Sequence, residues 1–368
     1  MKITFALVEH LPNDDRVWYQ QSQALFERAH EVFIISVTNK KFEGENFFYI
    51  DKNLTFSQKI NNFYQYFSII NPDVFVCDNP LSILAASRYK RKNRKKQIKI
   101  YYDITEWHPS KSNFHNVSKI KKIIKIPLLC GISFYASWLV SGFIFGEYYK
   151  SIPYKLFFWK KSINLSYYAD LKQIKTFAIN ENNEKFVLFF AGKLNEEWGF
   201  NTILTVAKQC AEQFPNTDFL LRAISRDYDC EFARQLYGMK NLKTEILPLM
   251  NFEEFCAKFG EADIFFDLRK IDFENSHSLP IKLFYYMAAG HPVVFSNLKA
   301  IRKGVPEIDE FGFLVNPKNI KQIADIVVKY LLNKQLYEKH CYRARQLCEE
   351  KYNWENIKNK FIEFVENT

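Results

Sequence analysis

Residues 276–294 read SHSLPIKLFYYMAAGHPVV, and this stretch decides the fold. Ser278 can cap a first helical turn, and Pro280 suits an opening position that needs no backbone donor. Gly290, followed by Pro292, ends the helix before an apolar strand. The apolar residues of the helix share one face at helical spacing: Ile281, Phe284, Tyr285 and Ala288. The pattern predicts a short helix packed onto a sheet, and no ligand is needed to explain it.

Lys282 does not fit this simple explanation. A cation in the first turn opposes the positive end of the helix dipole unless an anion binds there. The backbone amides of Leu279, Ile281 and Lys282, together with the dipole and the ammonium group, can form a site for a pyrophosphate. Doubly wound α/β domains bind ligands in the crevice at the carboxyl ends of their strands. The helix therefore predicts a site for a phosphorylated ligand.

The rest of the chain alternates short apolar strands with amphipathic helices. In the first half the alternating segments are 3–8, 17–28, 32–37, 58–70, 74–77, 81–88 and 98–103. After a polar stretch at 170–184 they are 186–191, 200–213, 219–223, 231–237, 244–247, 252–259, 263–268, 280–289, 292–296 and a helical tail from 320. We predict an α/β protein with two Rossmann-like doubly wound domains, 1–170 and 184–350, and a C-terminal helix at 351–368 that packs back towards the first domain.

Composition indicates a folded protein that binds anions. Of the 368 residues 48% are hydrophobic and 17% aromatic, which is enough for a real core. The net charge of +10 favours nucleotides, phospholipid head groups or nucleic acid as partners. The seven cysteines are scattered and form no C-x-x-C pair, so neither a disulfide framework nor a zinc site is indicated and a reducing cytosol is expected. We expect no metal and no other cofactor.

Residues 127–146 form a stretch of twenty residues without a charge, the length of a membrane span. Gly142 divides it into an amphipathic helix up to about Val140 and a strand at 143–145, and we favour this buried helix and strand over a span. The flanking residues suit a surface that rests on an anionic bilayer: Lys119, Lys121, Lys122, Lys125, Tyr148, Tyr149, Tyr154, Phe157, Phe158 and Trp159. We expect a cytoplasmic protein with peripheral contact to the inner face of the cell membrane.

A second basic stretch, KRKNRKK at 90–96, is of the kind found in nucleic-acid patches. It closes a predicted helix, where cations suit the dipole, and no aromatic stacking motif accompanies it. We expect a solvated or membrane-facing turn here and no nucleic-acid partner.

Residues 280–294 resemble the donor-binding helix of GT-B glycosyltransferases, notably the large family 4 (group 1), whose members often read P-x-K-x-F-E-Y-M-A-A-G-x-P-V. Further stretches are similar to family motifs in the same order along the chain: LPNDDRV at 11–17, ALFERAHEV at 24–32, FGFLV at 311–315 and YNW at 352–354. The resemblance implies a GT-B fold, in which two Rossmann-like domains face a central cleft and the C-terminal domain binds a nucleotide-sugar. It also implies transfer with retention of configuration.

The resemblance implies a donor site that lacks the two usual carboxylates. The family flanks its donor with an E-x7-E pair, whose second glutamate holds the ribose, but this chain has His277 and Tyr285 there. His277 can hydrogen-bond the sugar or a phosphate, or be an ordinary surface or core residue. Gly-Lys at 192–193 and Trp-Gly at 198–199 replace the family's G-R and K-G phosphate contacts. The implied donor-binding residues are Lys193, His277, Ser278, Leu279, Ile281, Lys282 and Tyr285.

Candidate acceptor residues gather at predicted strand ends. The segment YDITEWHP at 102–109 resembles the family's D-x-H-E segment at the mouth of the cleft, with Thr105 in place of the histidine. Orienting an acceptor hydroxyl, or accepting its proton, needs a base within hydrogen-bond reach. Asp103, Glu106 and His10 are the catalytic candidates, although Asp103 can equally cap a loop. The other residues expected to face the cleft are Asp15, Arg16, His108 and Arg269.

The expected function is glycosyl transfer from a nucleotide-diphosphate sugar to a hydroxyl of a glycan or lipid-linked acceptor, in the synthesis of bacterial envelope polysaccharide. Lys193, Lys282 and helix amides would stabilise charge on the leaving diphosphate in place of a metal. The alternative is a GT-B-shaped protein that lost catalysis with its E-x7-E carboxylates and acts as a binding or scaffolding partner in a glycan-assembly complex.

Overall fold

A computed structural model describes residues 1–367 except 111–113, 115–117, 176–184 and 228–239, so the helix predicted at 231–237 lies outside the described residues. The chain divides into two compact units: unit 1 comprises Met1–Tyr167 with Ile357–Thr368, and unit 2 comprises Tyr168–Asn356. Unit 2 begins earlier than residue 184 because the stretch after Tyr168 is tied to the end of the chain by a bridge between Ala169 and Asn353 and an ion pair between Lys172 and Glu355.

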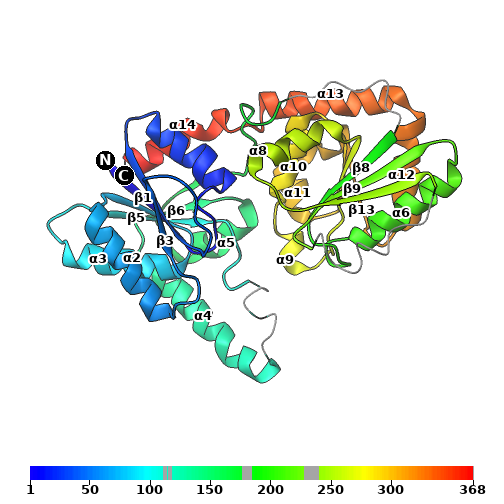
Figure 1. The fold of residues 1–368 in the computed structure, drawn as a ribbon. Helices are drawn as coiled ribbons and strands as arrows, with labels where there is room; N and C mark the ends of the chain where they lie inside the picture. Colours follow the sequence, from blue (N-terminus) through cyan, green and yellow to red (C-terminus); the bar gives the residue numbers. More distant parts are fainter. Residues whose placement is uncertain (111–113, 115–117, 176–184, 228–239, 368) are drawn as a thin grey trace. The chain divides into compact units, whose positions relative to one another are not determined.

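Unit 1 is built on a seven-stranded parallel sheet in the order β3-β2-β1-β4-β5-β6-β7 (Figure 1). The strands are β1 (Lys2–Leu7), β2 (Glu31–Val37), β3 (Phe47–Ile50), β4 (Val74–Cys77), β5 (Lys99–Ile104), β6 (Gly142–Phe145) and β7 (Lys161–Asn164). The helices are η1 (Asp15–Ser22, a π-helix), α1 (Gln23–Phe26), α2 (Phe56–Ile70), α3 (Pro80–Lys92), α4 (Lys119–Leu139), α5 (Tyr148–Phe157) and α14 (Glu355–Glu366).

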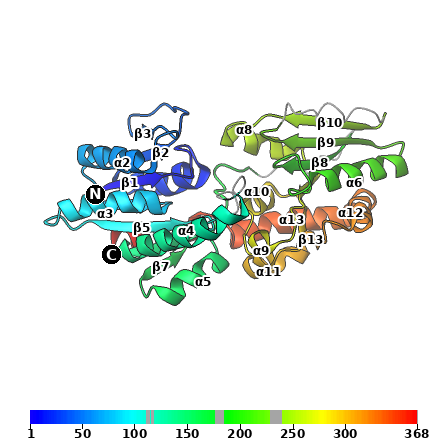
Figure 2. The ribbon, with the colours of Figure 1, turned by 90° about the horizontal axis from the view of Figure 1, so that it is seen from below.

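Helices cover both faces of this sheet. On one face α2, α3 and α4 lie side by side (Figure 2) and enclose a core that includes Phe63, Phe75 and Tyr102. On the other face lies α14, whose Phe364 ring is centred 4.9 Å from that of Tyr101. Tyr101 and Tyr102 reach different layers because successive side chains of a strand point to opposite faces. Burial on both faces explains why the central strands are mostly apolar.

Unit 2 is built on a six-stranded parallel sheet in the order β10-β9-β8-β11-β12-β13. The strands are β8 (Lys185–Ala191), β9 (Asp218–Ile224), β10 (Leu242–Leu247), β11 (Ile264–Asp267), β12 (Val293–Ser296) and β13 (Gly312–Val315). The helices are α6 (Phe200–Gln213), α8 (Phe252–Ala257), η3 (Lys258–Glu261), α9 (Phe273–Ser276), α10 (Ile281–Ala289), α11 (Lys299–Gly304), η4 (Pro306–Glu310), α12 (Ile320–Leu332) and α13 (Lys334–Glu350).

The sheet of unit 2 also packs helices on both faces. Phe266 of β11 belongs to a core shared with Ile203 of α6 and Val327 of α12. Its neighbour Phe265 stacks instead on Tyr286 of α10, with ring centroids 4.0 Å apart. The predicted α/β class with two doubly wound domains is confirmed. The strands that the sequence pattern missed, β3, β7 and β13, lie at the edges of the two sheets and are only partly buried, so they lack the continuous apolar run of the central strands.

The uncharged stretch at 127–146 divides as predicted, but its helix is not buried. The strand β6 is buried in the sheet between β5 and β7. In α4 the buried side chains among the described ones are Ser133, Ala136 and Ser137, and only 17% of the window Lys121–Leu139 is buried. Among the described residues this is the one helix long and apolar enough to cross a membrane.

Candidate functional site

In unit 2 a charged cluster lies where β8 and β11 end. Asp267, the last residue of β11, is buried and forms a bidentate ion pair with Arg269, in which Arg269 Nε lies 2.7 Å from Asp267 Oδ1. Lys282, in the first turn of α10, donates from Nζ to the backbone carbonyl of Ala191, the last residue of β8. The strands β8 and β11 pair with each other, so their carboxyl ends bring these groups together.

The indole ring of Trp198 contacts both cations of this cluster. Arg269 Cζ lies 4.9 Å and Lys282 Nζ 5.4 Å from the ring centroid. Trp198 belongs to the loop between β8 and α6, which closely approaches the end of β11. The next residue, Gly199, has a φ of 78°, and a Cβ there would lie 2.2 Å from the carbonyl oxygen of Leu268. Only glycine fits, and this close approach fixes the position of the ring.

The charges of the cluster are not balanced. Burial lowers the pKa of Lys282 to about 8. The nearby Asp267 acts in the opposite direction and raises this pKa, whereas the positive charge of Arg269 lowers it further. Burial alone would raise the pKa of Asp267, but the Arg269 guanidinium holds it below its ordinary value. Two basic groups thus face one carboxylate. A bound anion would favour the charged form of Lys282, because an opposite charge nearby stabilises an ammonium ion.

The structure corrects the expected start of the donor helix. Ser278 does not cap α10, because its hydroxyl donates to the carbonyl of Glu274, 2.8 Å away in the short helix α9. The helix begins at Ile281, directly after Pro280. Leu279 is buried, Ile281 is half-buried, and Lys193 is exposed in the loop that carries Trp198.

The residues that replace the two family carboxylates have partners of their own. His277 Nδ1 lies 2.7 Å from the carbonyl oxygen of Phe273, and the two rings are centred 4.6 Å apart. Tyr285 is buried and packs on Phe252 of α8, with ring centroids 5.4 Å apart. Neither side chain supplies the acceptor pair that a carboxylate offers to a ribose.

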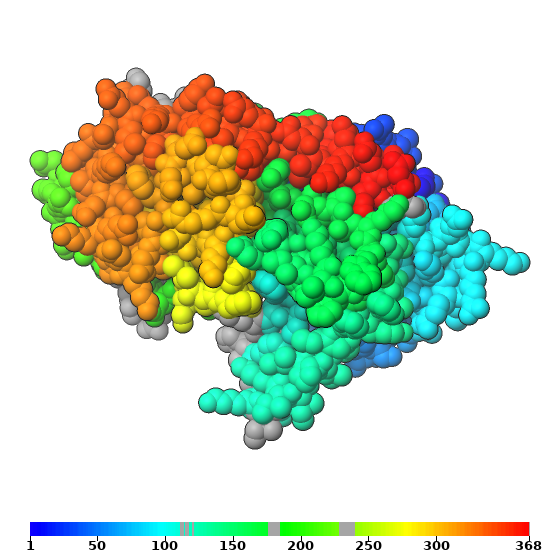
Figure 3. Space-filling view, turned by 180° about the vertical axis from the view of Figure 1, so that it is seen from behind, coloured from blue at the N-terminus to red at the C-terminus, as the bar shows by residue number. Residues whose placement is uncertain are grey.

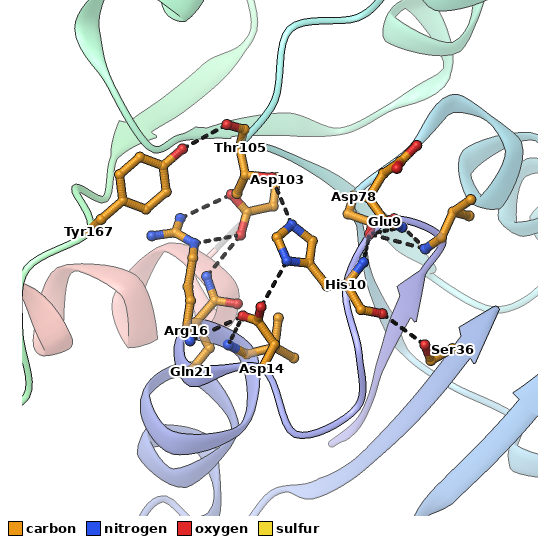
Figure 4. A network of polar contacts seen from close by, with 12 residues as sticks. Glu9, His10, Asp14, Arg16, Gln21, Ser36, Asp78, Asp103, Thr105 and Tyr167 are labelled. Carbon is orange, nitrogen blue, oxygen red and sulfur yellow. Dashed lines mark hydrogen bonds and ion pairs between the residues drawn. The ribbon is translucent and has the colours of Figure 1, made fainter. Parts of the chain in front are cut away.

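In unit 1 a polar network is centred on His10, which follows β1 (Figure 4). Its Nδ1 lies 2.9 Å from Asp14 Oδ2, and its Nε2 lies 2.9 Å from Thr105 Oγ1. The carboxylate of Asp78 accepts the backbone amides of Val8, Glu9 and His10 at 2.8, 2.9 and 3.3 Å. Asp78 follows β4 and Thr105 follows β5, and because β1, β4 and β5 are neighbours in the sheet, their ends meet.

Arg16 and Asp103 form a buried ion pair beside His10. Arg16 Nε and Nη2 donate to the two carboxylate oxygens of Asp103 at 3.2 and 3.0 Å. Gln21 adds a hydrogen bond of 2.9 Å to the same carboxylate, and Arg16 also donates to the carbonyl of Leu165 at 2.7 Å. The guanidinium lies 5.2 Å from the centre of the Tyr167 ring. Both oxygens of Asp103 are engaged, which favours a structural role over catalysis.

The electrostatics of this network set the protonation states. Burial would lower the pKa of His10, but Asp14 raises it to about 10, so the imidazole is a cation at neutral pH. A protonated imidazole donates hydrogen bonds and cannot accept the proton of a hydroxyl. Burial and the adjacent Asp14 raise the pKa of Asp15 to about 7, and burial raises that of Asp78 to about 6. Asp15 is therefore a better proton acceptor than His10.

Glu106 and His108 make no hydrogen bond with His10 or Arg16 among the described contacts, and Arg269 belongs to unit 2. Glu106 is exposed, with its carboxylate 3.9 Å from Nζ of Lys150, and His108 is half-buried, which lowers its pKa. Lys150 itself is buried, donates to the carbonyl of Thr105 and pairs with Glu147 at 2.6 Å. Arg269, grouped by the sequence with the acceptor residues, belongs to the Lys282 cluster of unit 2.

A small cavity of about 10 Å³ lies against the network of unit 1, with room for one water molecule. Its polar lining includes His10, Arg16, Asp78 and Asp103. Among the described residues no group of three His, Cys, Asp or Glu side chains is placed to hold a metal ion. Sequence reasoning missed Asp14, Asp78 and Asp267; the signal for Asp78 was its place directly after the strand predicted at 74–77.

Known proteins share this architecture. Residues 172–347 match the family of glycosyl transferases group 1, and no curated protein matches the chain in sequence. The solved sucrose-phosphate synthase from Thermosynechococcus elongatus is similar at a TM-score of 0.73 and 12% identity, over 99% of this chain and 98% of that one. Anabaena Alr3699/HepE in complex with UDP-glucose is similar at 0.71 and 14% identity, over 100% of both chains. A glycosyltransferase from Rickettsia africae ESF-5 is similar at 0.66 and 12%, over 100% and 98%.

Proposed function

We propose that this chain, which has the GT-B fold and matches the group 1 glycosyl transferases over residues 172–347, moves a sugar from a nucleotide-diphosphate sugar to a hydroxyl of a glycan or lipid-linked acceptor. The observation that carries the proposal is the unbalanced cluster of Lys282, Arg269 and Trp198 at the carboxyl ends of β8 and β11. Doubly wound domains bind ligands at this edge of the sheet. The binding of UDP-glucose by the similar Anabaena HepE supports a nucleotide-sugar donor.

The donor-side chemistry follows from this cluster. As the bond between the sugar and the diphosphate breaks, negative charge grows on the leaving diphosphate. Lys282, the amides at the first turn of α10 and the exposed Lys193 can stabilise that charge. Because the protein's own cations supply this stabilisation, we propose a metal-independent transfer. The proposal that the transfer retains configuration rests on the resemblance of the donor helix alone.

For the acceptor we propose residues of unit 1. The acceptor hydroxyl must lose its proton as its oxygen bonds to the sugar carbon. Asp15, with a pKa of about 7, can accept that proton. Both ring nitrogens of the cationic His10 are engaged by Asp14 and Thr105, so His10 acts by holding this network in place. We further propose that the protein acts in the cytoplasm in the synthesis of bacterial envelope polysaccharide.

The rival function is that of a catalytically degenerate GT-B protein that binds or scaffolds partners in a glycan-assembly complex. The positions of His277 and Tyr285 favour it, because neither replaces the carboxylate that holds a ribose in the family. The two functions differ in one measurable property, the binding and turnover of a nucleotide-sugar.

Calorimetric titration with UDP-, GDP-, ADP- and CMP-sugars tests the proposal. We expect one nucleotide class to bind, and Lys282→Ala to weaken that binding at least about thirtyfold, because a charge-assisted contact to the diphosphate is lost. The control is Lys339→Ala, which removes an exposed lysine on α13. Turnover is measured as the amount of free nucleotide released. If the folded protein binds none of the four classes, the scaffolding function replaces the proposed one.

A further inference from the structure

The first turns of α4 expose large apolar side chains next to the lysines of the same turns. Ile123 and Ile124 are 72% and 70% exposed, and Leu128 is 59% exposed. Figure 1 shows this end of α4 projecting beyond the sheet of unit 1, and in the space-filling view of Figure 3 it forms a protrusion at the lower edge. Soluble proteins rarely leave a group of large apolar side chains this exposed unless a partner or a membrane binds there. The exposed end of α4 therefore indicates a surface that is covered when the protein works.

The exposed apolar surface continues from α4 onto α5. The ring of Phe134 in α4 is centred 6.2 Å from that of Phe157, the last residue of α5. Trp138 is 62% and Trp159, just after α5, is 97% exposed. We call this region the α4–α5 surface, comprising Ile123, Ile124, Leu128, Trp138, Phe157 and Trp159. Monomeric soluble proteins rarely expose apolar side chains in such a continuous group.

The charge around the α4–α5 surface is positive. Residues 119–161 contain eight lysines and one carboxylate, Glu147, and that carboxylate is buried in its ion pair with Lys150. Lys119 and Lys121 are exposed at the beginning of α4, next to the exposed isoleucines. Apolar and aromatic side chains bordered by lysines match the two layers of an anionic bilayer, acyl chains and phosphate head groups.

The sheet topology excludes a single membrane crossing by α4. The strand before it, β5, and the strand after it, β6, pair in parallel in the same sheet. One crossing would place these two strands on opposite sides of the membrane. The last turns of α4 are also held in the core by Ala136 and Ser137, and Lys160 closes the helix by donating to the carbonyls of Trp138 and Val140, each at 2.6 Å.

We propose that the α4–α5 surface docks this chain onto an anionic phospholipid bilayer, with the first turns of α4 lying in the interface and the lysines on the head groups. A lipid-linked acceptor would then be presented at the same surface on which the enzyme rests. The inference does not rest on the proposed function, because it uses neither the donor cluster nor the His10 network.

Co-sedimentation with vesicles tests the docking. The full chain is mixed with vesicles of phosphatidylglycerol and phosphatidylcholine, and separately with phosphatidylcholine alone, without nucleotide. We expect binding to the anionic vesicles, and at least about tenfold weaker binding for Ile123→Glu/Ile124→Glu, because two apolar side chains are replaced by anions. Both positions are exposed, so the variant should fold, which circular dichroism checks. The matched control is Leu332→Glu, a 68% exposed position at the end of α12 in unit 2, which should bind like the natural chain.

A second measurement separates the bilayer from other occupants. Lys119→Gln/Lys121→Gln should weaken binding to anionic vesicles. The tryptophan fluorescence of the natural chain should shift to shorter wavelength on binding, because Trp138 and Trp159 move from water into the bilayer interface. The proposal is overturned if the full chain stays in the supernatant with anionic vesicles, or if Leu332→Glu reduces binding as much as the α4 variant. It is also overturned if the chain forms a dimer that Ile123→Glu/Ile124→Glu dissociates and neither form binds vesicles, because a second copy would then cover the surface.

Discussion

The two polar clusters at the strand ends of this protein differ in their charge balance. In unit 1 each cation has its own carboxylate: His10 pairs with Asp14, and Arg16 pairs with Asp103. In unit 2 Arg269 occupies both oxygens of Asp267, and Lys282 is left with a backbone carbonyl and a depressed pKa. A cluster in which each cation is paired stabilises the fold, whereas a cluster with a surplus cation attracts an anion. This difference supports the proposal that the diphosphate binds in unit 2.

The largest effect should come from breaking the balance in unit 1. Arg16→Ala leaves the Asp103 carboxylate buried without its cation, so we expect a loss of about 3–5 kcal/mol in the free energy of unfolding of unit 1. Urea unfolding followed by circular dichroism measures it. Arg88→Ala, which removes an exposed arginine that contacts Asn61, should cost less than about 1 kcal/mol. Equal stabilities for the two variants would show that the buried pair is not required.

The second effect concerns the pH dependence of stability. The pKa of His10 is raised to about 10 in the folded chain, above its ordinary value near 6.5, so its stabilising contribution is complete below about pH 6.5 and lost as the pH rises through about 10. Between these values the slope is about 1.4 kcal/mol per pH unit. We expect the free energy of unfolding, measured with urea, to fall with this slope from pH 6.5 to 8 in the natural chain and not in Asp14→Asn; above about pH 8 the depressed pKa of Lys282 adds an opposite slope. Parallel curves for the two proteins would contradict the assigned charge of His10.

The third effect is the pH dependence of nucleotide binding by unit 2. Lys282 is half deprotonated at about pH 8 without a ligand, and a bound diphosphate would raise its pKa. Affinity for the nucleotide should therefore fall by up to about tenfold per pH unit above 8. Calorimetry between pH 7 and 9.5 measures it. In Lys282→Arg the affinity should vary little over this range, since an arginine stays charged; a matching decline in that variant would place the titrating group elsewhere.

The smallest effect should come from Trp198. Replacement by Leu removes two cation–π contacts, which we expect to weaken nucleotide-sugar binding about fivefold, or about 1 kcal/mol. Trp198→Phe keeps an aromatic face and should lie between Leu and the natural residue. Thermal unfolding of both variants shows whether the loop next to Gly199 has moved. An unchanged affinity for Trp198→Leu in a stably folded protein would remove the ring from the site.

Much of the fold could be predicted because its signals are local. Alternating strands and helices, and the Gly290 and Pro292 that end α10, are encoded in neighbouring residues. The cap at Ser278 was predicted wrongly because its hydroxyl bonds back to α9, a helix of four residues without a periodic pattern. Lys282 stood out because a cation at a helix start contradicts the dipole. The site residues named from the resemblance remain predictions.

Contacts between distant segments explain what the sequence did not reveal. Asp78 joins His10 because β1 and β4 are neighbours, and the order of strands in the chain does not reveal their order in the sheet. Asp267 is recognised as part of the site only from its ion pair with Arg269, whose guanidinium contacts Trp198. Hydropathy predicted a buried helix before β6, but hydropathy records only that a helix is apolar. Whether α4 is buried depends on how far the sheet of unit 1 extends along it, and the first turns of α4 project beyond that sheet (Figure 1).

The path of the chain through unit 1 also affects the order in which the two units can fold. Residues 357–366 of α14 complete that unit, burying Phe361, Ile362 and Val365, although all of unit 2 precedes them in the chain. Domains generally fold in the order in which the ribosome makes them. Here Tyr101 of the sheet lacks its contact with Phe364 until the residues of α14 have been synthesised. The unit that is begun first is therefore finished last, and unit 2 can fold before unit 1 is complete.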